Sequence, residues 1–391
     1  MSNPEAQSSE TVCAPGPARL EILEPRDVPL GGLRAMNVRR TLPQRGRTLI
    51  GAWCFLDHYG PDEVAESGGM NVPAHPHIGL QTVSWLFSGE IEHRDSAGFH
   101  AVVRPGELNL MTAGRGISHS ERSSPGTTVL HGAQLWVALP SHARTTPKTF
   151  EHYVPPVLSG AGAGAGVGTG TSTGWTVQVF LGSLLGHSSP VSTHTELVGA
   201  EIVLDPGCEL VLDVAQAHEH GILVDSGSVT VGSDGAAGQD STAEPDSIAG
   251  PNSAVAANQL AFLPAGASTL RIIAGADGAR LLLIGGEPLG EDLVMWWNFV
   301  GRDHAEIVQA RADWQAELAA AGVHDVAVEG LSGTDTDAGS GSHPAPTGSP
   351  TESPTGSPTE SPSDRFGLPS GEPEPPLSAP PAPIAKLLPR R

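Results

Sequence analysis

The chain is poor in cysteine and in basic residues, and each shortage excludes a class of protein. Its 391 residues include only three cysteines, Cys13, Cys54 and Cys208, with no spacing typical of a disulfide framework or a zinc site. Lys and Arg number 21 against 43 Asp and Glu, which gives a formal net charge of −22. We therefore expect reduced thiols and no direct binding to nucleic acid or to an anionic membrane.

Long hydrophobic runs and targeting segments are also missing. No stretch of 18 consecutive apolar residues occurs, and the N-terminus lacks the basic and apolar regions of a signal peptide. No GxGxxG pattern follows a predicted strand, and no phosphate-binding loop is present. These absences predict a cytoplasmic protein without nucleotide-dependent chemistry.

Composition divides the chain into two halves. Residues 18–148 carry 13 Lys and Arg and 12 Asp and Glu, whereas residues 149–270 carry 12 Asp and Glu and no Lys or Arg. We therefore predict one domain at 18–148, after a flexible N-terminal tail at 1–17, and a second domain at 149–325. Within the second domain, the Gly- and Ala-rich residues 159–174 predict a flexible loop, and residues 233–258 predict a surface insertion in a hairpin.

The last part of the chain differs from both halves. From about residue 330 it is rich in Ser, Thr, Pro and Gly, with repeated TGSP and TESP tetrads, and Phe366 is its only aromatic residue. So little apolar surface cannot offset the entropy lost on ordering. We predict a disordered tail at 326–391, whose deletion from residue 331 onward should leave folding and metal content unchanged.

Short runs rich in Val, Leu, Ile, Phe and Trp recur between Gly, Pro and Asp residues in both halves, for example GLQTVSWLFSG and ARLLLIGG. This spacing predicts an all-β sandwich or barrel that occurs twice. One helix is also predicted, because Asp303 and Glu306 form a variant of the capping box. Its apolar face would consist of Ile307, Ala310, Trp314 and Leu318, and would pack against the outside of a barrel.

Two pairs of potential metal ligands share one spacing. His75 and His77 are two residues apart, as are His119 and Glu121, and a strand points residues i and i+2 to the same face. If the two strands face each other across a barrel, three imidazoles and one carboxylate converge on a first-row transition metal with open coordination positions. A single HxH pair is also common as a polar strand edge, so this interpretation depends on the second pair.

Other polar residues have weaker claims to a role. His218 and His220 repeat the HxH spacing, but no HxE pattern follows before the predicted helix, so we interpret them as structural or solvent-facing. His93, Asp95 and Arg115 could orient the ligands or form surface ion pairs.

Four blocks of the sequence resemble the signature blocks of pirins, which are bicupins of the cupin superfamily. They are VPLGGLRAMNVRRTLPQRGRTLIGAWCFLDHYGP, HPHIGLQTVSWLFSGEIEHRDS, RPGELNLMTAGRGISHSE and GEPLGEDLVMWWNFV. The resemblance covers roughly residues 18–320 and is more specific in the first half. It implies two cupin-type antiparallel β-barrels, with an iron-type metal in the first.

The pirin metal ligands fall on the two histidines of HxH and the two residues of HxE. In this chain those positions are His75, His77, His119 and Glu121. Many pirins have glutamate where this chain has Gln81, so Glu121 is the sole carboxylate candidate. The resemblance implies one divalent ion, Fe(II) first, with Mn, Ni, Cu or Zn left open.

The resemblance also implies two alternative functions. Pirins are associated with quercetin 2,3-dioxygenase activity, which opens a flavonol ring and releases carbon monoxide; in that hypothesis Glu121 is both a ligand and the general base for the flavonol hydroxyl. Pirins are also linked to transcriptional co-regulation and to metabolic enzymes, so the alternative is a non-enzymatic iron- or redox-dependent regulator that binds a protein partner. A roomy apolar pocket that reaches the metal would favour the oxygenase. For either function we expect a monomer.

Overall fold

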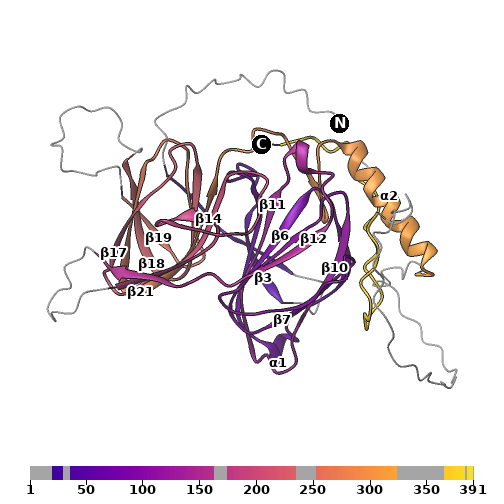
Figure 1. Cartoon of the computed structure of the whole chain (residues 1–391), viewed down its shortest axis with the longest axis horizontal. Coiled ribbons are helices and arrows are strands. Elements are labelled where there is room, and N and C mark those ends of the chain that lie inside the picture. The colour runs from indigo at the N-terminus through magenta and orange to yellow at the C-terminus, as the bar shows by residue number, and fades with distance from the viewer. Residues whose placement is uncertain are drawn as a thin grey trace, which may run out of the picture.

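The computed structural model describes residues 20–29, 36–162, 174–234, 252–323, 365–383 and 385–390. Antiparallel β-structure forms two units that lie side by side (Figure 1), which confirms the predicted all-β class. The predicted N-terminal tail, residues 326–364 and most of the two predicted loops lie outside the described residues. Among the described residues, neither helix has the length and hydropathy needed to cross a membrane.

The first unit consists of two sheets. The larger sheet has the order β12-β9-β6-β11-β4-β3-β2, with strands β2 (Arg26–Pro29), β3 (Asn37–Leu42), β4 (Trp53–Glu63), β6 (Leu80–Ser88), β9 (Leu108–Thr112), β11 (Val129–Ala138) and β12 (Thr149–Tyr153). The smaller sheet has the order β5-β10-β7-β8, with strands β5 (Asn71–His77), β7 (Ile91–Asp95), β8 (His100–Val103) and β10 (Ile117–Ser123). The short helix α1 (Val64–Ser67) follows β4, and a 3-10 turn, Ser141–Ala143, follows β11. Buried Tyr59 of one sheet packs in the same cluster as Ile91 of the other, so a core lies between the sheets.

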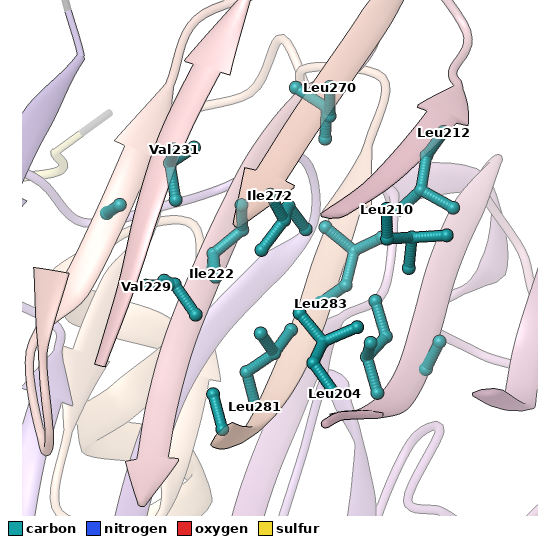
Figure 2. Close-up of a cluster of buried hydrophobic side chains, with 14 of the residues drawn as sticks. Leu204, Leu210, Leu212, Ile222, Val229, Val231, Leu270, Ile272, Leu281 and Leu283 are labelled. Atoms are coloured by element: carbon teal, nitrogen blue, oxygen red, sulfur yellow. The ribbon is translucent and has the colours of Figure 1, made fainter. Parts of the chain in front are cut away.

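The second unit is a single sheet that bends around an aliphatic core. Its strands are β1 (Glu21–Leu23), β13 (Leu158–Ala161), β14 (Gly174–Leu184), β15 (His187–Ser188), β16 (Leu197–Leu204), β17 (Glu209–Asp213), β18 (Glu219–Ser233), β19 (Ser253–Ala256), β20 (Leu260–Leu263) and β21 (Thr269–Gly286). Figure 2 shows inward-pointing side chains of this core, such as Leu210, Ile222 and Leu283. Val231 pairs with Ser253, so the predicted insertion is a hairpin connection, but its last part is strand β19.

Three segments cross the domain boundary that we predicted at residues 148 and 149. β1 pairs with β20 and therefore extends the sheet of the second unit, whereas β12 pairs with β9 of the first unit. The hairpin of β22 (Val294–Trp296) and β23 (Phe299–Gly301), followed by helix α2 (His304–Ala320), packs on the first unit, where Phe299 bridges to Ile78. The two units thus exchange chain segments at both ends.

The predicted helix is confirmed in its capping and in its buried face. The side chain of Asp303 accepts a hydrogen bond from the backbone N–H of Glu306 at 2.9 Å, which satisfies a free donor of the first turn. The buried residues are the four that we expected, Ile307, Ala310, Trp314 and Leu318.

Part of the predicted tail, residues 365–383, has a defined position in the structure. Residues 365–383 run beside α2 (Figure 1), and the Phe366 ring is fully buried against Trp314 and Phe299. The Glu317 carboxylate accepts hydrogen bonds from the backbone N–H groups of Phe366 and Gly367. Phe366 and Ala379 belong to one buried cluster with Trp314 and Leu318 of α2, and the tail's own composition does not show this partner surface.

A buried carboxylate joins the two units across their interface. Asp225 of β18 lies 2.7 Å from His58 Nε2 and 2.6 Å from His131 Nε2, both from the first unit, and accepts a bond from Arg280 Nε at 2.8 Å. Burial alone would raise the pKa of Asp225, but the hydrogen bonds from His131, His58 and Arg280 hold it well below its usual range. The interface therefore depends on an ionised aspartate.

Replacing Phe366 should destabilise the whole protein. We expect Phe366→Ala to lower the free energy of unfolding by about 3–5 kcal/mol, because it leaves a cavity beside Trp314. Urea unfolding would measure the change. Leu388→Ala is the control, since Leu388 is 70% exposed, and its effect should stay within about 0.5 kcal/mol. Equal stability of the two variants would contradict the account of the tail.

Removing the charge of Asp225 should weaken the junction between the units. We expect Asp225→Asn to lower the free energy of unfolding by about 3–5 kcal/mol, because the buried His58 and His131, together with Arg280, lose an ionised acceptor. Asp213→Asn, at an exposed carboxylate of β17, is the matched control. Urea unfolding measures the free energies of unfolding. If those of the two variants differ by less than about 0.5 kcal/mol, the hydrogen bonds of Asp225 do not stabilise the junction.

Candidate metal centre

The two predicted ligand pairs lie on neighbouring strands. β5 and β10 are antiparallel, with His75 opposite His119 and His77 opposite Ile117. We expected the strands to face each other across a barrel; instead they are hydrogen-bonded to each other. The register shifts between His119 and Glu121, so Glu121 lies opposite Val72. The extra residue of this bulge lies in β5, because two residues along β10 correspond to three along β5; β10 itself pairs regularly with β7, so Glu121 stays on the face of His119.

The hydrogen bonds of the imidazoles fix their tautomers. His75 Nδ1 lies 3.0 Å from the carbonyl oxygen of Pro73, and His77 Nδ1 lies 3.0 Å from that of Asn298. A carbonyl oxygen can only accept, so each Nδ1 carries the proton and each Nε2 presents a lone pair. His77 Nε2 and His119 Nε2 are 3.0 Å apart, and the ligand nitrogens of all three histidines lie within 4.8 Å of one another.

This donor set fits a first-row transition metal. Two ligands about 2.1 Å from one ion and at right angles to each other are separated by about 3.0 Å, close to the separation of the His77 and His119 nitrogens. Neutral imidazoles without a thiolate suit iron, copper, nickel or zinc. A cation between these nitrogens would also relieve the repulsion of lone pairs that point at each other.

Burial keeps the three imidazoles in the form that binds metal. It lowers the pKa of His75 to about 4, and it lowers the pKa values of His77 and His119 well below their usual range. The imidazoles next to one another add to the effect, because two protonated rings would repel. At neutral pH all three are uncharged, so a cation does not have to displace a proton.

Glu121 lies next to the three histidines without joining their group. Its carboxylate groups instead with His93 and His119, whose ligand atoms lie within 4.8 Å of it and of one another. Ser84 Oγ donates to Glu121 Oε1 at 3.2 Å, and burial raises the pKa of this carboxyl group. The structure thus groups His75, His77 and His119, and it brings Glu121 into the cavity that they line.

His93 and Asp95 support His119 from behind. His93 Nδ1 lies 3.4 Å from His119 Nδ1, and His93 Nε2 lies 3.2 Å from Asp95 Oδ2. Both residues are buried, so of the two alternatives that the sequence left open, an orienting role fits and a surface pair does not. Arg115 is exposed, and Gln81 donates to Thr112 at 2.9 Å without lining the site.

A cavity of about 450 Å³ reaches the three histidines, and Glu121 lines it as well. Its walls combine aliphatic residues with the aromatic residues Phe55, Tyr59, Trp136 and Trp297, and Phe55 stacks on Trp136 with ring centroids 4.0 Å apart. Arg40 and Asp57 also line the cavity, but they neutralise each other through two hydrogen bonds of 2.6 and 2.7 Å.

Sequence reasoning missed the contribution of the β22–β23 hairpin. Its two-residue turn, Trp297 and Asn298, lines the cavity, and the Asn298 carbonyl oxygen holds His77. Trp297 has a φ of 51°, an uncommon conformation for a bulky residue and a sign of functional strain. No pattern in the sequence indicated that this turn, 220 residues after His77, would close the site.

The second unit has no equivalent centre among its described residues. His218 and His220 are buried with ring centroids 6.1 Å apart, and no group of potential metal ligands found in the described part of the chain includes them. They stay structural histidines, as we predicted, although they do not face solvent.

Family models for pirin and for the pirin C-terminal cupin domain match residues 34–137 and 199–318. The chain belongs to the pirin family. A Pseudomonas aeruginosa pirin relative, named as a candidate quercetin 2,3-dioxygenase, is 37% identical over 319 residues, which cover 81% of this chain and 91% of the relative. A pirin-like protein of Caulobacter vibrioides is 33% identical and covers 72% of this chain and 88% of its own length.

Solved structures agree with this assignment to the pirins. A crystal structure of quercetin 2,3-dioxygenase from Acinetobacter baumannii superimposes with a TM-score of 0.64 at 34% sequence identity, over 76% of this chain and 88% of that one. The two units of this pirin are therefore the two cupin domains of a bicupin, and the resemblance stated from the sequence blocks is confirmed.

The buried histidines should make the metal-free protein sensitive to acid. Between pH 6.5 and about 4 the unfolded chain binds protons at His75 and His220, whereas the folded chain does not, because the pKa of each is about 4 when folded. The free energy of unfolding should therefore decrease as the pH is lowered, by up to about 1.4 kcal/mol per pH unit for each such histidine. Urea unfolding from pH 7 to 4.5 measures the slope, and His75→Gln should reduce it. A flat profile would contradict the burial of these rings.

Proposed function

We propose that this pirin is a metal-dependent oxygenase that acts on flavonol-type substrates, in the manner of a quercetin 2,3-dioxygenase. The observation that carries the proposal is the position of three neutral imidazoles at the wall of a cavity of about 450 Å³ with aromatic sides. Small-molecule sites commonly occupy about 300–1,000 Å³. The names of the Pseudomonas and Acinetobacter relatives support the same reaction class.

His75, His77 and His119 would hold the metal ion, Fe(II) first, and Glu121, which lines the same cavity, would be the carboxylate ligand. When bound, such an ion supplies a Lewis acid for a substrate oxygen and open positions for dioxygen chemistry. The hydrogen bonds of His75 and His77 to backbone carbonyl oxygens orient the two rings toward that position.

Glu121 would take the proton of the substrate hydroxyl on its carboxylate. Burial raises the pKa of Glu121, which brings the group nearer to the pH at which a base must work. Ser84 Oγ lies 3.2 Å from Glu121 Oε1 and 2.8 Å from Gln134 Oε1, but a hydroxyl has only one hydrogen to donate. Ser84 can therefore stabilise the ionised carboxylate and turn to Gln134 when Glu121 is protonated.

The aromatic walls would bind the planar substrate. Phe55 and Trp136 stack on each other, and Trp297 also lines the cavity. A flavonol can bury its rings against these side chains and exclude water from the histidines. A cavity of this size supports an oxygenase more than a regulator that needs only a surface.

Oxygen uptake with quercetin tests the proposal. We expect the Fe(II)-loaded protein to consume dioxygen and release carbon monoxide, and the His75→Ala, His119→Ala double variant to lose both activity and bound metal. His100→Ala, at an exposed histidine of β8, is the control and should retain both. A fully metal-loaded protein that consumes no oxygen would contradict the oxygenase and favour the regulator.

The role of Glu121 has its own test. We expect Glu121→Gln to lower kcat by about 100-fold or more while the three histidines still retain the ion, because the amide cannot accept the hydroxyl proton. Stopped-flow kinetics combined with elemental analysis of the same sample separates the two effects. An unchanged kcat at full metal content would remove Glu121 from the reaction.

A further inference from the structure

The C-terminal segment Arg365–Pro383 covers the outer face of the strand that carries His119 and Glu121. Side chains alternate along β10, so Ser118, Ser120 and Arg122 point away from the cavity. Ser118 Oγ donates to the Gly367 carbonyl oxygen at 2.6 Å, and Ser120 Oγ donates to the Glu372 carboxylate at 2.7 Å. The tail is thus fastened to the back of the metal centre.

Ionic contacts extend this attachment. Arg122 forms an ion pair of 2.7 Å with Glu372, and both side chains are largely buried, with 15% and 9% exposure. Asn71 of β5 donates to the Glu374 carboxylate at 3.0 Å. The segment therefore follows β10 and then passes over β5, which is the edge strand of its sheet.

Leu377 lies where the segment reaches the cavity. Its backbone N–H donates to the Ala74 carbonyl oxygen at 2.8 Å, one residue before His75, and its own carbonyl oxygen accepts from Trp314 Nε1 at 2.9 Å. Leu377 lines the cavity together with Trp297 and the three histidines. Both hydrogen bonds are made by the backbone, so they hold Leu377 in place whatever its side chain is.

We propose that Leu377 is a specificity-determining residue, and that the segment Arg365–Pro383 is the wall that limits the size of the molecule reaching the metal centre. Leu377 lies beyond residue 318, where the match to the pirin C-terminal cupin model ends. The tail therefore gives this chain a cavity wall that the matched domains do not include. The kind of substrate rests on the function proposed above, whereas the wall itself rests on the contacts of Leu377.

Binding of two flavonols of different size tests this inference without turnover. Trp136 and Trp297 line the cavity, so quenching of tryptophan fluorescence reports the Kd of quercetin and of quercetin 7-O-glucoside in metal-loaded or metal-free protein. We expect Leu377→Ala to improve the affinity for the glucoside relative to quercetin by about 10-fold, and Leu377→Trp to weaken the binding of both. Leu388→Ala, at a leucine of the tail that does not line the cavity, should change neither.

The possible outcomes separate the two proposals. A Kd ratio that Leu377→Ala leaves unchanged, or unchanged affinities for both flavonols in Leu377→Trp, would overturn the role of Leu377, even if the protein consumes oxygen with quercetin. The expected change in the ratio without any oxygen uptake would support the wall and contradict the oxygenase. Failure of the wild-type protein to bind either flavonol would overturn both.

Discussion

The antiparallel pairing of β5 with β10 is the constraint on which the candidate site depends. It places His75 opposite His119, and the alternation of side chains along β5 brings His77 to the same face. A shift of one residue in this register would turn the imidazoles to the outer face, where the tail packs. Backbone carbonyls of Pro73 and Asn298 then fix which ring nitrogen faces the cavity.

The second cupin domain acts on the site through packing rather than through ligands. It supplies Asp225 to two histidines of the first domain, and Trp53 of the first domain donates to the Gly285 carbonyl oxygen at 3.0 Å. These bonds hold β4 and β11, the strands that carry Phe55 and Trp136 on the cavity wall. Residues 149–270 contain no Lys or Arg, and they contact His58 and His131 of the first domain through the carboxylate of Asp225.

Local sequence patterns predicted the features that depend on neighbouring residues within one strand or one helix. The i, i+2 spacing found the three grouped histidines, and the capping residue and apolar face found helix α2, because both signals lie within one strand or one helix. The same reasoning could not show that His93 is buried behind His119, since that depends on the packing of β7 against β10. Nor could it show that the carboxylate of Glu121, which lines the same cavity as the three histidines, groups with His93 and His119.

Contacts between distant segments were out of reach for a similar reason. Phe366 and Leu377 lie in a segment whose composition predicts disorder. Their partners are Trp314 and Ala74, and nothing in the sequence indicates that either residue contacts the C-terminal segment. Composition reports how much apolar surface a segment has, but one well-placed ring can anchor it. The pairing of β1 with the second domain could not be predicted either, because a strand of three residues does not indicate which sheet it joins.

X-ray absorption spectroscopy of the Fe(II)-loaded protein tests the central claim most directly, because it reports the atoms bound to the ion. The account predicts nitrogen and oxygen neighbours at about 2.1 Å, with the multiple scattering typical of imidazole from three histidines, and loss of that scattering in His77→Ala. A spectrum with sulfur neighbours, or one that His77→Ala leaves unchanged, would contradict it.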